Sequence, residues 1–600
     1  MKSNSLLTIE RIEPPFWYIG MHNPILQIMC YGKNIAKLQV SISNSTPIIK
    51  VQRTENPNYL FITINTKNSP PTEFYFIFKE KDKVVLTQKY SLKQRKENSA
   101  QRKSFESSDV LYLLMPDRFS NGNSNNKNDV STTEKYNRKL PEGRHGGDIQ
   151  GIINHLDYIQ ELGATTIWST PLCEDNDTEC SYHTYAQSDV YKIDPRYGTN
   201  EDYLKLSSEI HRRKMKLIMD YVTNHWGLEH WMIKDLPTQD WINQFENYTQ
   251  TNHKRTLVHD INASQIDTKI CFDGWFVPTM PDLNQRNPLV LNYLTQNAIW
   301  WIEYAELDGF RVDTYNYADP EAIAKWTKAI TEEYPNFNIV GEISMRDQAQ
   351  ISYWQKDSPI GKIRNFNSHL PSVMDFILSD ALLTIFNEDG NWETGMIRIY
   401  NNFTNDFLYP NPNNLLIFAE NHDTHRVNHV YLNDIRKYKM VMALIATVRG
   451  TPQLYYGSEV GMAGNKDNGD ADIRQDFPGG WEGDAINAFT KAGRTPGQNE
   501  YFDFTSKLFN WRKNKSVVHF GKMTHYIPED NTYVYFRHNS NESVMVLFNN
   551  NDEIKTLKTD RFIENIQNFK TGKNVSTDEI IDITNEIILE AKSALILELK

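Results

Sequence analysis

Eight short apolar runs recur between residues 110 and 456, and segments long enough to form helices separate them. Several runs end on or beside a charged residue, as a strand of a parallel barrel does when it delivers a functional side chain to its C-terminal end. Strands that alternate with helices favour a parallel sheet, so eight of them predict an α/β fold, the (β/α)8 TIM barrel. The runs are residues 111–115, 165–168, 217–220, 308–312, 339–342, 373–376, 415–419 and 453–456.

The flanks of this pattern differ from it. Residues 1–92 and 516–600 contain short alternating or aromatic runs, which predict an N-terminal β-sandwich and a C-terminal β-sandwich domain. Residues 93–108 are rich in Lys, Arg, Ser, Glu and Gln, a composition that cannot pack a core and predicts a linker. The barrel is therefore expected over residues 109–515. About ninety residues separate its third and fourth runs, too many for a simple crossover, which predicts an overhanging lobe at residues 226–284.

Composition argues against several classes of partner. The chain has a net charge of -12 with mixed signs and no basic arm, so nucleic acid is not expected. No apolar stretch reaches the roughly 18 residues of a membrane span, and the N-terminus lacks the apolar core of a signal peptide. We therefore expect a soluble protein, cytoplasmic as written, or periplasmic if a signal peptide has been removed. The four cysteines fit no metal spacing and are expected to be mostly buried, although Cys173 and Cys180 would be able to pair in an oxidising compartment.

Three acidic residues lie where predicted strands end. Asp313 closes Asp308-Gly-Phe-Arg-Val-Asp313, Glu342 closes Val340-Gly-Glu342, and Asp423 closes Glu420-Asn-His-Asp423. Splitting a glycosidic bond with retention requires a carboxylate that meets the oxocarbenium-like centre and a carboxylic acid that protonates the leaving oxygen, about 5 to 5.5 Å apart. Asp313 and Glu342 suit these roles.

Arg311 lies two residues before Asp313, on the same face of the expected strand. Its charge is expected to hold Asp313 ionised and to lower the pKa of that carboxyl. Glu342 has no such neighbour in sequence, and a pocket closed by substrate would raise its pKa toward that of a working acid. An isolated Arg-x-Asp is more often a structural ion pair, so the functional interpretation depends on the other acids.

Four ordered motifs carry a family resemblance. The chain resembles the α-amylase superfamily, family 13 of the glycoside hydrolases, over nearly its whole length. The resemblance implies that Asp313 is the nucleophile, Glu342 the general acid/base and Asp423 a third carboxylate that grips sugar hydroxyls. It also implies that Arg311, His225 and His422 support sugar binding. The motifs are Asp220-Tyr-Val-Thr-Asn-His225, Gly309-Phe-Arg-Val-Asp313, Gly341-Glu342 and Asn421-His-Asp423.

A fifth motif, Ser181-Tyr-His-Thr-Tyr185, resembles the family's Tyr-His-Gly-Tyr, with Thr184 in place of Gly. It implies that His183 bonds the reacting glucose and that Tyr185 stacks on it. Trp275 and Phe276, in the lobe, fit a sugar platform and the lobe core equally well.

Domain order and two further motifs resemble the neopullulanase and cyclomaltodextrinase branch. That likeness implies an α-glucan hydrolase that retains configuration at α-1,4-glucosidic bonds of cyclodextrins, maltooligosaccharides or pullulan. Relatives often form homodimers through the N-terminal domain, so a homodimer is one implied assembly. The motifs are Met280-Pro-Asp-Leu-Asn284 and Arg474-Gln-Asp-Phe-Pro-Gly-Gly-Trp481.

Residues 117–129 form a polar run whose carbonyl and carboxylate oxygens are the hard ligands that Ca²⁺ prefers. The run resembles the calcium loop of the same branch, although an Asn-, Gly- and Ser-rich run is by default simply a loop. The resemblance implies a structural Ca²⁺ with ligands Asn121, Asn123, Asn128, Asp129, Gly146 and Asp148.

Two other functions use the same residues. A transglycosylase would let another sugar intercept the covalent intermediate, and a non-catalytic glucan-binding protein would use the scaffold without the reaction. The presence of all three carboxylates favours an enzyme.

Overall fold

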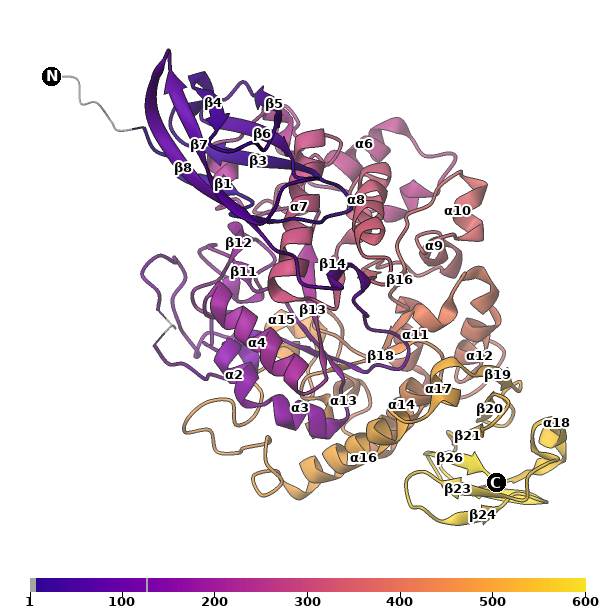
Figure 1. Cartoon of the computed structure of the whole chain (residues 1–600). Coiled ribbons are helices and arrows are strands. Elements are labelled where there is room, and N and C mark those ends of the chain that lie inside the picture. Colours follow the sequence, from indigo (N-terminus) through magenta and orange to yellow (C-terminus); the bar gives the residue numbers. More distant parts are fainter. Residues whose placement is uncertain (1–6, 126–127) are drawn as a thin grey trace.

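The computed structural model describes residues 7–125 and 128–600, and a parallel barrel stands at its centre (Figure 1). The eight strands run in the order β16-β15-β14-β13-β10-β9-β18-β17, and a single parallel bridge between Met374 and Leu416 closes the cylinder. Each predicted run overlaps one of these strands, so the predicted barrel is confirmed. The strands are β9 (Leu111–Leu114), β10 (Thr166–Ser169), β13 (Lys216–Val222), β14 (Gly309–Asp313), β15 (Asn338–Gly341), β16 (Ser372–Val373), β17 (Leu416–Phe418) and β18 (Thr451–Tyr455).

Helices surround the barrel, and local sequence fixes where several of them begin. Thr199 and Asp202 form a reciprocal capping box at α4, and Thr495 and Gln498 form one at α16. Proline occupies the first turn of α7, α8 and α16, where its missing N–H removes no helical hydrogen bond. The helices named here are α4 (Asn200–Arg212), α7 (Pro288–Ala305), α8 (Pro320–Glu333), α11 (Phe376–Leu382), α12 (Ile397–Thr404), α14 (Ile435–Thr447) and α16 (Pro496–Arg512).

The N-terminal domain is a sandwich of two four-stranded sheets, as predicted. One sheet has the order β1-β3-β6-β5 and the other β2-β8-β7-β4. Along β7, Phe74, Phe76 and Phe78 alternate inward and are buried, which is the period-two pattern of a half-buried strand. The strands are β1 (Arg11–Glu13), β2 (Trp17–Tyr18), β3 (Ile25–Tyr31), β4 (Gln39–Ile42), β5 (Ile48–Arg53), β6 (Tyr59–Asn65), β7 (Thr72–Glu80) and β8 (Lys83–Lys93).

The C-terminal domain is also built of strands and lies beyond α14 and α16 (Figure 1). Its larger sheet has the order β19-β20-β21-β26-β23-β24, and β22 pairs with β25. The strands are β19 (Lys522–His525), β20 (Thr532–His538), β21 (Ser543–Asn549), β22 (Lys555–Lys558), β23 (Thr571–Asn574), β24 (Ile580–Asp582), β25 (Glu586–Leu589) and β26 (Ser593–Leu599).

The segment between the N-terminal domain and the barrel is held firmly, although its composition predicts a linker. Arg95 donates to Glu303 of α7 at 2.8 Å and to Glu333 of α8 at 2.6 Å. Phe105 is buried in the core. Ion pairs therefore attach a segment that has too few apolar side chains to form a core of its own.

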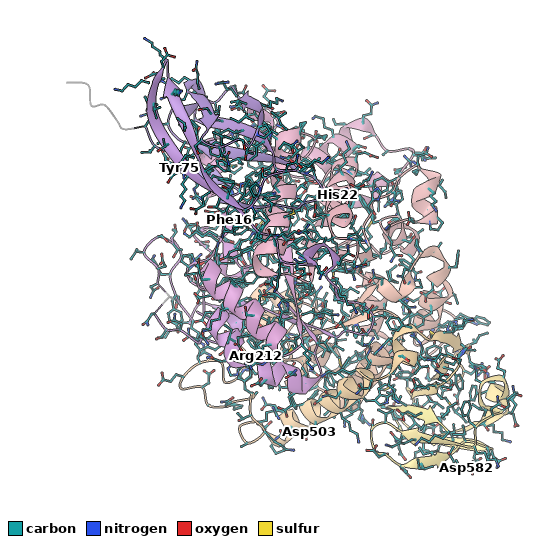
Figure 2. All side chains as sticks on the ribbon, in the orientation of Figure 1. Phe16, His22, Tyr75, Arg212, Asp503 and Asp582 are labelled. Atoms are coloured by element: carbon teal, nitrogen blue, oxygen red, sulfur yellow. The ribbon has the colours of Figure 1, made fainter. Side chains whose placement is uncertain are left out.

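The insertion between β13 and β14 forms the predicted lobe and contacts the N-terminal domain. Its short helices are α5 (Trp231–Lys234) and α6 (Gln265–Asp273). Asn56 and Asn58 donate to the Asp235 carboxylate at 2.6 and 2.7 Å. Figure 2 labels Phe16, whose ring lies 5.4 Å from that of Trp300 on α7. The sandwich thus packs against both lobe and barrel.

Two further expectations from the sequence concern membranes and cysteines. Within residues 7–125 and 128–600, none of the helices combines the length and apolar character that crossing a bilayer requires. All four cysteines are free thiols, and three of them, Cys30, Cys173 and Cys271, are buried while Cys180 is partly exposed.

Candidate active site

The ends of three neighbouring strands bring together four of the charged side chains. In the parallel register of β13 and β14, Asp220 lies opposite Arg311. In that of β14 and β15, Val312 lies opposite Gly341. Asp313 and Glu342 are the residues that follow this second pair. Because side chains alternate along a strand, Arg311 and Asp313 share one face. All of these groups lie at the C-terminal end of the barrel, where barrel enzymes place their sites.

Arg311 joins the carboxylates directly. Its Nη1 donates to Asp220 at 2.9 Å and to Asp313 at 2.8 Å, and its Nη2 donates to Glu342 at 2.8 Å. The guanidinium is buried, and buried charge-assisted bonds of this kind are strong and directional. Asp313 and Glu342 are therefore held on adjacent nitrogens of one rigid fork.

Glu342 has the environment of a general acid. Burial raises the pKa of its carboxyl to about 7, while Arg311 opposes this shift and the nearby Asp313 and Asp423 reinforce it. The Thr314 backbone N–H also donates to it at 3.0 Å. The sequence showed no charged neighbour for Glu342, and the structure supplies Arg311 through the fold.

The pKa of Asp313 differs from the expectation. Burial raises it to about 6, since this effect and the repulsion from Asp220 outweigh the lowering by Arg311. Arg311 acts in the expected direction, but the expected net lowering is wrong because the Asp313 side chain is only 9% exposed. Sequence proximity reveals the charged partner and not the depth of burial.

Asp423 approaches the same pocket from the segment after β17. Burial acts to raise the pKa of its carboxyl, but His422, Arg474 and Arg311 together bring it below the usual range, so Asp423 is ionised. Arg474 donates to it at 2.8 Å. Its side chain is 42% exposed, so a ligand is able to reach it from solvent.

Tyr185 and His422 form a stacked pair at the pocket. Their rings lie 5.7 Å apart at 6°, and the Tyr185 hydroxyl is 2.8 Å from His422 Nε2. The same hydroxyl donates to Asp220 at 3.0 Å. His183 lies beside this pair, since its Nδ1 accepts the Tyr185 N–H at 3.0 Å. Burial lowers the pKa of His183 and of His422 to about 3, so both rings are neutral.

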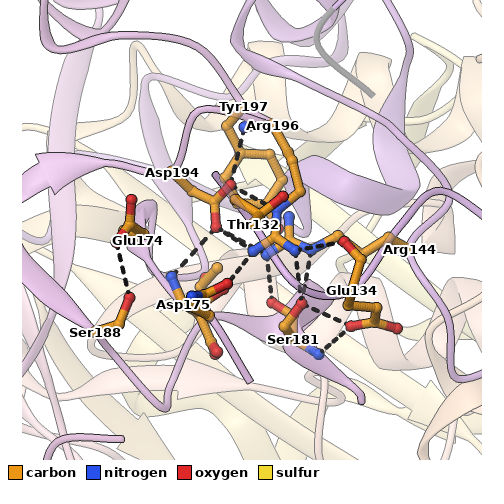
Figure 3. Close-up of polar contacts among 12 residues, drawn as sticks. Thr132, Glu134, Arg144, Glu174, Asp175, Ser181, Ser188, Asp194, Arg196 and Tyr197 are labelled. Atoms are coloured by element: carbon orange, nitrogen blue, oxygen red, sulfur yellow. Dashed lines mark hydrogen bonds and ion pairs between the residues drawn. The ribbon is translucent and has the colours of Figure 1, made fainter. Parts of the chain in front are cut away.

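Buried ion pairs hold the loop that carries His183 and Tyr185 (Figure 3). Arg144 donates to the Ser181 carbonyl at 2.6 Å and to Asp194 at 3.0 Å, and Arg196 donates to Asp194 at 2.7 Å. Glu134 accepts from the Ser181 N–H at 2.7 Å. The start of the loop is thus fixed from three directions.

Thr184 occupies the position where the family motif has glycine, and its backbone conformation is one that glycine adopts most easily. Its φ of 59° lies in the left-handed region, which favours glycine. The Thr184 hydroxyl donates to the carbonyls of Pro171 and His183. These bonds hold a β-branched residue in a strained conformation between two predicted sugar-binding side chains.

His225 lies on the lobe side of the pocket. Its ring stacks on Phe276 at 4.9 Å and 11°, and Phe276 also packs edge-on against Tyr317 at 5.3 Å. Burial lowers the pKa of His225 to about 3. Phe276 and Trp275 are both partly buried, and the Trp275 indole donates to the Asn243 carbonyl at 2.6 Å within the lobe.

Sequence reasoning missed two residues of this arrangement. Asp220 bonds Arg311, Tyr185 and the Trp168 indole, and Arg474 bonds both Asp423 and the His422 carbonyl. Asp220 ends a predicted strand and Arg474 begins a quoted motif, so both positions were visible. Their partners lie too far away in the chain to be read from spacing.

Only some of the predicted calcium ligands bond to one another in the structure. The Asp148 carboxylate accepts the N–H groups of Asn123 at 2.8 Å and Gly151 at 2.7 Å, and Asn121 donates to the Gly146 carbonyl. Asn128 and Asp129 bond elsewhere, to the N–H groups of Tyr136 at 3.0 Å and Ser131 at 2.8 Å. Asn121, Asn123, Gly146 and Asp148 thus lie near one another, but Asn121 and Asn123 are joined to the other two through N–H groups, and Asn123 Oδ1 accepts the Asn125 N–H at 3.1 Å. The run also includes residues 126–127, which lie outside the described residues.

Comparison with known proteins assigns a family to each part of the chain. The family described as "Alpha amylase, catalytic domain" matches residues 113–554. "Cyclomaltodextrinase, N-terminal" matches residues 11–96, and "Cyclo-malto-dextrinase C-terminal domain" matches residues 523–598.

Individual relatives are similar over most of their length. A cyclomaltodextrinase of Geobacillus thermopakistaniensis is 29% identical over 450 residues, which cover 74% of this chain and 69% of the relative. Neopullulanase 2 of Thermoactinomyces vulgaris is 28% identical, over 75% of this chain and 70% of its own. The structure of an α-amylase from Geobacillus thermoleovorans with acarbose superposes with a TM-score of 0.67 at 25% identity, covering 83% of this chain and 99% of that one. Because the catalytic family matches well over half of its residues, this chain belongs to the α-amylase family of glycoside hydrolases.

Proposed function

We propose that this protein hydrolyses α-1,4-glucosidic bonds with retention of configuration, in cyclodextrins, maltooligosaccharides or pullulan. Asp313 attacks the anomeric carbon and forms a covalent glucosyl-enzyme, while Glu342 protonates the leaving oxygen and then activates a water molecule. The observation that carries the proposal is the Arg311 fork, which bonds Asp313 through Nη1 and Glu342 through Nη2.

The electrostatics support this division of roles. The pKa of Asp313 is raised to about 6 and that of Glu342 to about 7, so near neutral pH the first loses its proton more readily than the second. Two carboxyls that titrate in sequence provide an ionised nucleophile and a protonated acid at once. Asp423, Arg474 and the neutral His422 would then bind sugar hydroxyls.

Removing either carboxylate tests the roles. Asp313→Asn and Glu342→Gln should each lower kcat on a cyclodextrin by at least about a thousandfold, as loss of a nucleophile or acid/base does. Glu321→Gln, an exposed carboxylate at the start of α8, is the matched control and should leave kcat unchanged. Near-normal hydrolysis by Asp313→Asn would contradict the assignment.

The covalent step has a direct readout. With α-maltosyl fluoride, whose leaving group needs no proton, Glu342→Gln should accumulate a maltosyl-enzyme, and peptide mapping should place the adduct on Asp313. Initial release of the β-anomer from wild type, detected by proton NMR, would show inversion and rule the mechanism out. Chromatography of products from cyclodextrin, pullulan and soluble starch, supplied separately, would identify the preferred glucan.

We also propose a structural Ca²⁺ in the loop after β9, as the family resemblance implies. Burial raises the pKa of Asp148 to about 6, and a cation there would favour its ionised form. Asn121, Asn123, Gly146 and Asp148 would hold the ion, joined by Asn128 and Asp129 if their present hydrogen bonds exchange. EDTA should lower the Tm of the isolated protein and added Ca²⁺ should restore it. Equal Tm values, with no calcium in elemental analysis, would contradict the site.

A homodimer through the N-terminal domain is proposed on the same resemblance. Sedimentation velocity of the full chain and of a chain lacking residues 1–92 would test it, since only the full chain should sediment as a dimer.

A further inference from the structure

A nearly fully exposed tryptophan marks a cavity on the outer flank of the barrel. Trp392 lies between α11 and α12 and is 95% exposed. An exposed side chain alone is not informative, but Trp392 lines a cavity together with the apolar Ile397, Ile527 and Pro528. The cavity beside it has a volume of about 460 Å³ and includes Asn391, Ile527, Pro528, Asp530 and Asn531 among its lining. None of the predicted active-site residues lines it.

Hydrogen bonds hold the Trp392 loop in place. The Asn391 side-chain carbonyl accepts the N–H groups of Glu393 at 2.7 Å and Thr394 at 2.9 Å. At the end of the loop, Glu388 accepts the Gly395 N–H at 2.7 Å. These bonds fix the backbone on either side of Trp392, which reduces the entropy that the loop would lose on binding a ligand.

The C-terminal domain forms the other wall of the cavity. Asp530 and Asn531, with φ of 48° and 52°, form the tight turn before β20. The Asn531 side-chain carbonyl accepts the Gly390 N–H at 2.5 Å, and Asn550 donates to the Glu388 carbonyl at 3.2 Å. A Cβ at Gly390 would lie 2.3 Å from Asn531 Oδ1, so a larger residue there would displace the Asn531 side chain.

We propose that this cavity is a second glucan-binding site, separate from the catalytic pocket. The indole face of Trp392 fits the apolar C–H face of a pyranose. Asp530 and the side-chain amides of Asn391 and Asn531 supply an acceptor and donors for sugar hydroxyls. A concave site with an aromatic wall and a few polar groups is the general form of a small-ligand site. The inference rests on the proposed function, since the ligand has the chemistry of the substrate.

Such a site would affect long and short substrates differently. A polymeric glucan would bind at Trp392 and at the carboxylates together, which raises the effective concentration of chain near the active site. A cyclodextrin or maltotriose is too short to gain in this way. Loss of the indole should therefore weaken binding to starch and leave turnover of maltotriose unchanged.

Affinity electrophoresis through gels that contain soluble starch tests the proposal. Trp392→Ala should lower the apparent affinity for starch about tenfold, the effect of losing one well-packed aromatic contact. Trp392→Tyr should keep most of the affinity because it retains a ring. Phe407→Ala is the matched control, since Phe407 is also exposed, at 75%, and lies outside the cavity. It should bind starch as wild type does.

Hydrolysis of maltotriose by the same variants separates the two proposals. If wild type fails to hydrolyse any glucan but still binds starch through Trp392, the proposed function is wrong and the second site stands. If Trp392→Ala binds starch in the gel as tightly as wild type does, the proposed site is wrong. It is also wrong if Phe407→Ala loses as much starch affinity as Trp392→Ala. If Trp392→Ala instead changes the sedimentation coefficient and not the starch affinity, the surface is a protein interface, and that result also overturns it.

Discussion

Arg311 is the residue on which the geometry of the pocket depends most. A lysine would keep one charge, but all its donors are on one nitrogen, so it lacks the two separate nitrogens with which Arg311 bonds Asp313 and Glu342. Arg311→Lys should therefore lower kcat/KM by about a hundredfold to a thousandfold, as removal of a preorganised donor does. Steady-state kinetics on cyclodextrin measures this, with Arg346→Lys, a half-exposed arginine, as control. A loss below threefold would contradict the role.

The raised pKa values of the two carboxyls predict a narrow pH optimum. Below about 6 Asp313 becomes protonated and loses its nucleophilicity, and above about 7 Glu342 loses the proton that it must donate. A plot of kcat/KM for a cyclodextrin should therefore be bell-shaped, with a maximum between these values. The two limbs belong to the interacting pair.

A substrate that needs no acid provides the control for this profile. With α-maltosyl fluoride the alkaline limb near pH 7 should disappear, while the acidic limb should persist, because fluoride leaves without a proton. An unchanged alkaline limb would mean that a group other than Glu342 sets it.

How much of the site was predictable differs from residue to residue. Arg311 and Asp313 are two positions apart on one strand, so their pairing follows from strand geometry alone. The bond from Arg311 to Glu342 follows from the neighbouring positions of β14 and β15. The contacts of Asp220 with Tyr185 and of Arg474 with Asp423 join segments whose approach depends on loop conformation, which spacing does not reveal.

At the scale of elements, the loop that carries His183 and Tyr185 depends on buried arginines. Arg144→Met would remove the bonds of Arg144 to Ser181 and the ion pair between Arg144 and Asp194, while Asp194 would keep its ion pair with Arg196 (Figure 3). Breaking a buried ion pair costs about 3 to 5 kcal/mol, so we expect a lower Tm together with a higher KM. Arg212→Met, on the exposed surface of α4 in Figure 2, should change neither. A lower Tm with unchanged KM would show that the network stabilises the fold without positioning the loop.

Elements with a strong local pattern were the predictable ones. All eight barrel strands follow from short apolar runs, because a parallel strand covered on both faces is apolar over most of its length. Residues 93–108 show what the pattern misses. Their polar composition predicts a linker, yet Arg95 meets Glu303 and Glu333, acids that lie some two hundred residues further along the chain. Composition shows whether a segment has enough apolar side chains to form a core, but it does not show which charged side chains of neighbouring helices will bond to it.

At the scale of the whole molecule, Glu13 links the N-terminal domain to the barrel. Glu13 is buried and accepts from the Tyr293 hydroxyl of α7 at 2.6 Å, and Arg11 lies 3.6 Å from it. Burial, reinforced by Asp189, raises the pKa of Glu13 to about 8. The unfolded value is about 4.3, so the folded chain binds this proton more tightly. The free energy of unfolding should therefore fall as pH rises from about 4.3 through about 8.

Glu13→Gln tests this linkage because glutamine keeps an oxygen for Tyr293 and has no charge to bury. Guanidinium unfolding at pH 5 and pH 9 should show the wild-type midpoint falling between the two values, and the variant's midpoint falling less. At pH 9 the variant should be the more stable of the two. Glu10→Gln, on an exposed residue of the same domain, should follow wild type. If the guanidinium midpoint of Glu13→Gln falls between pH 5 and pH 9 by as much as that of wild type, the Glu13 carboxyl is not the group that titrates.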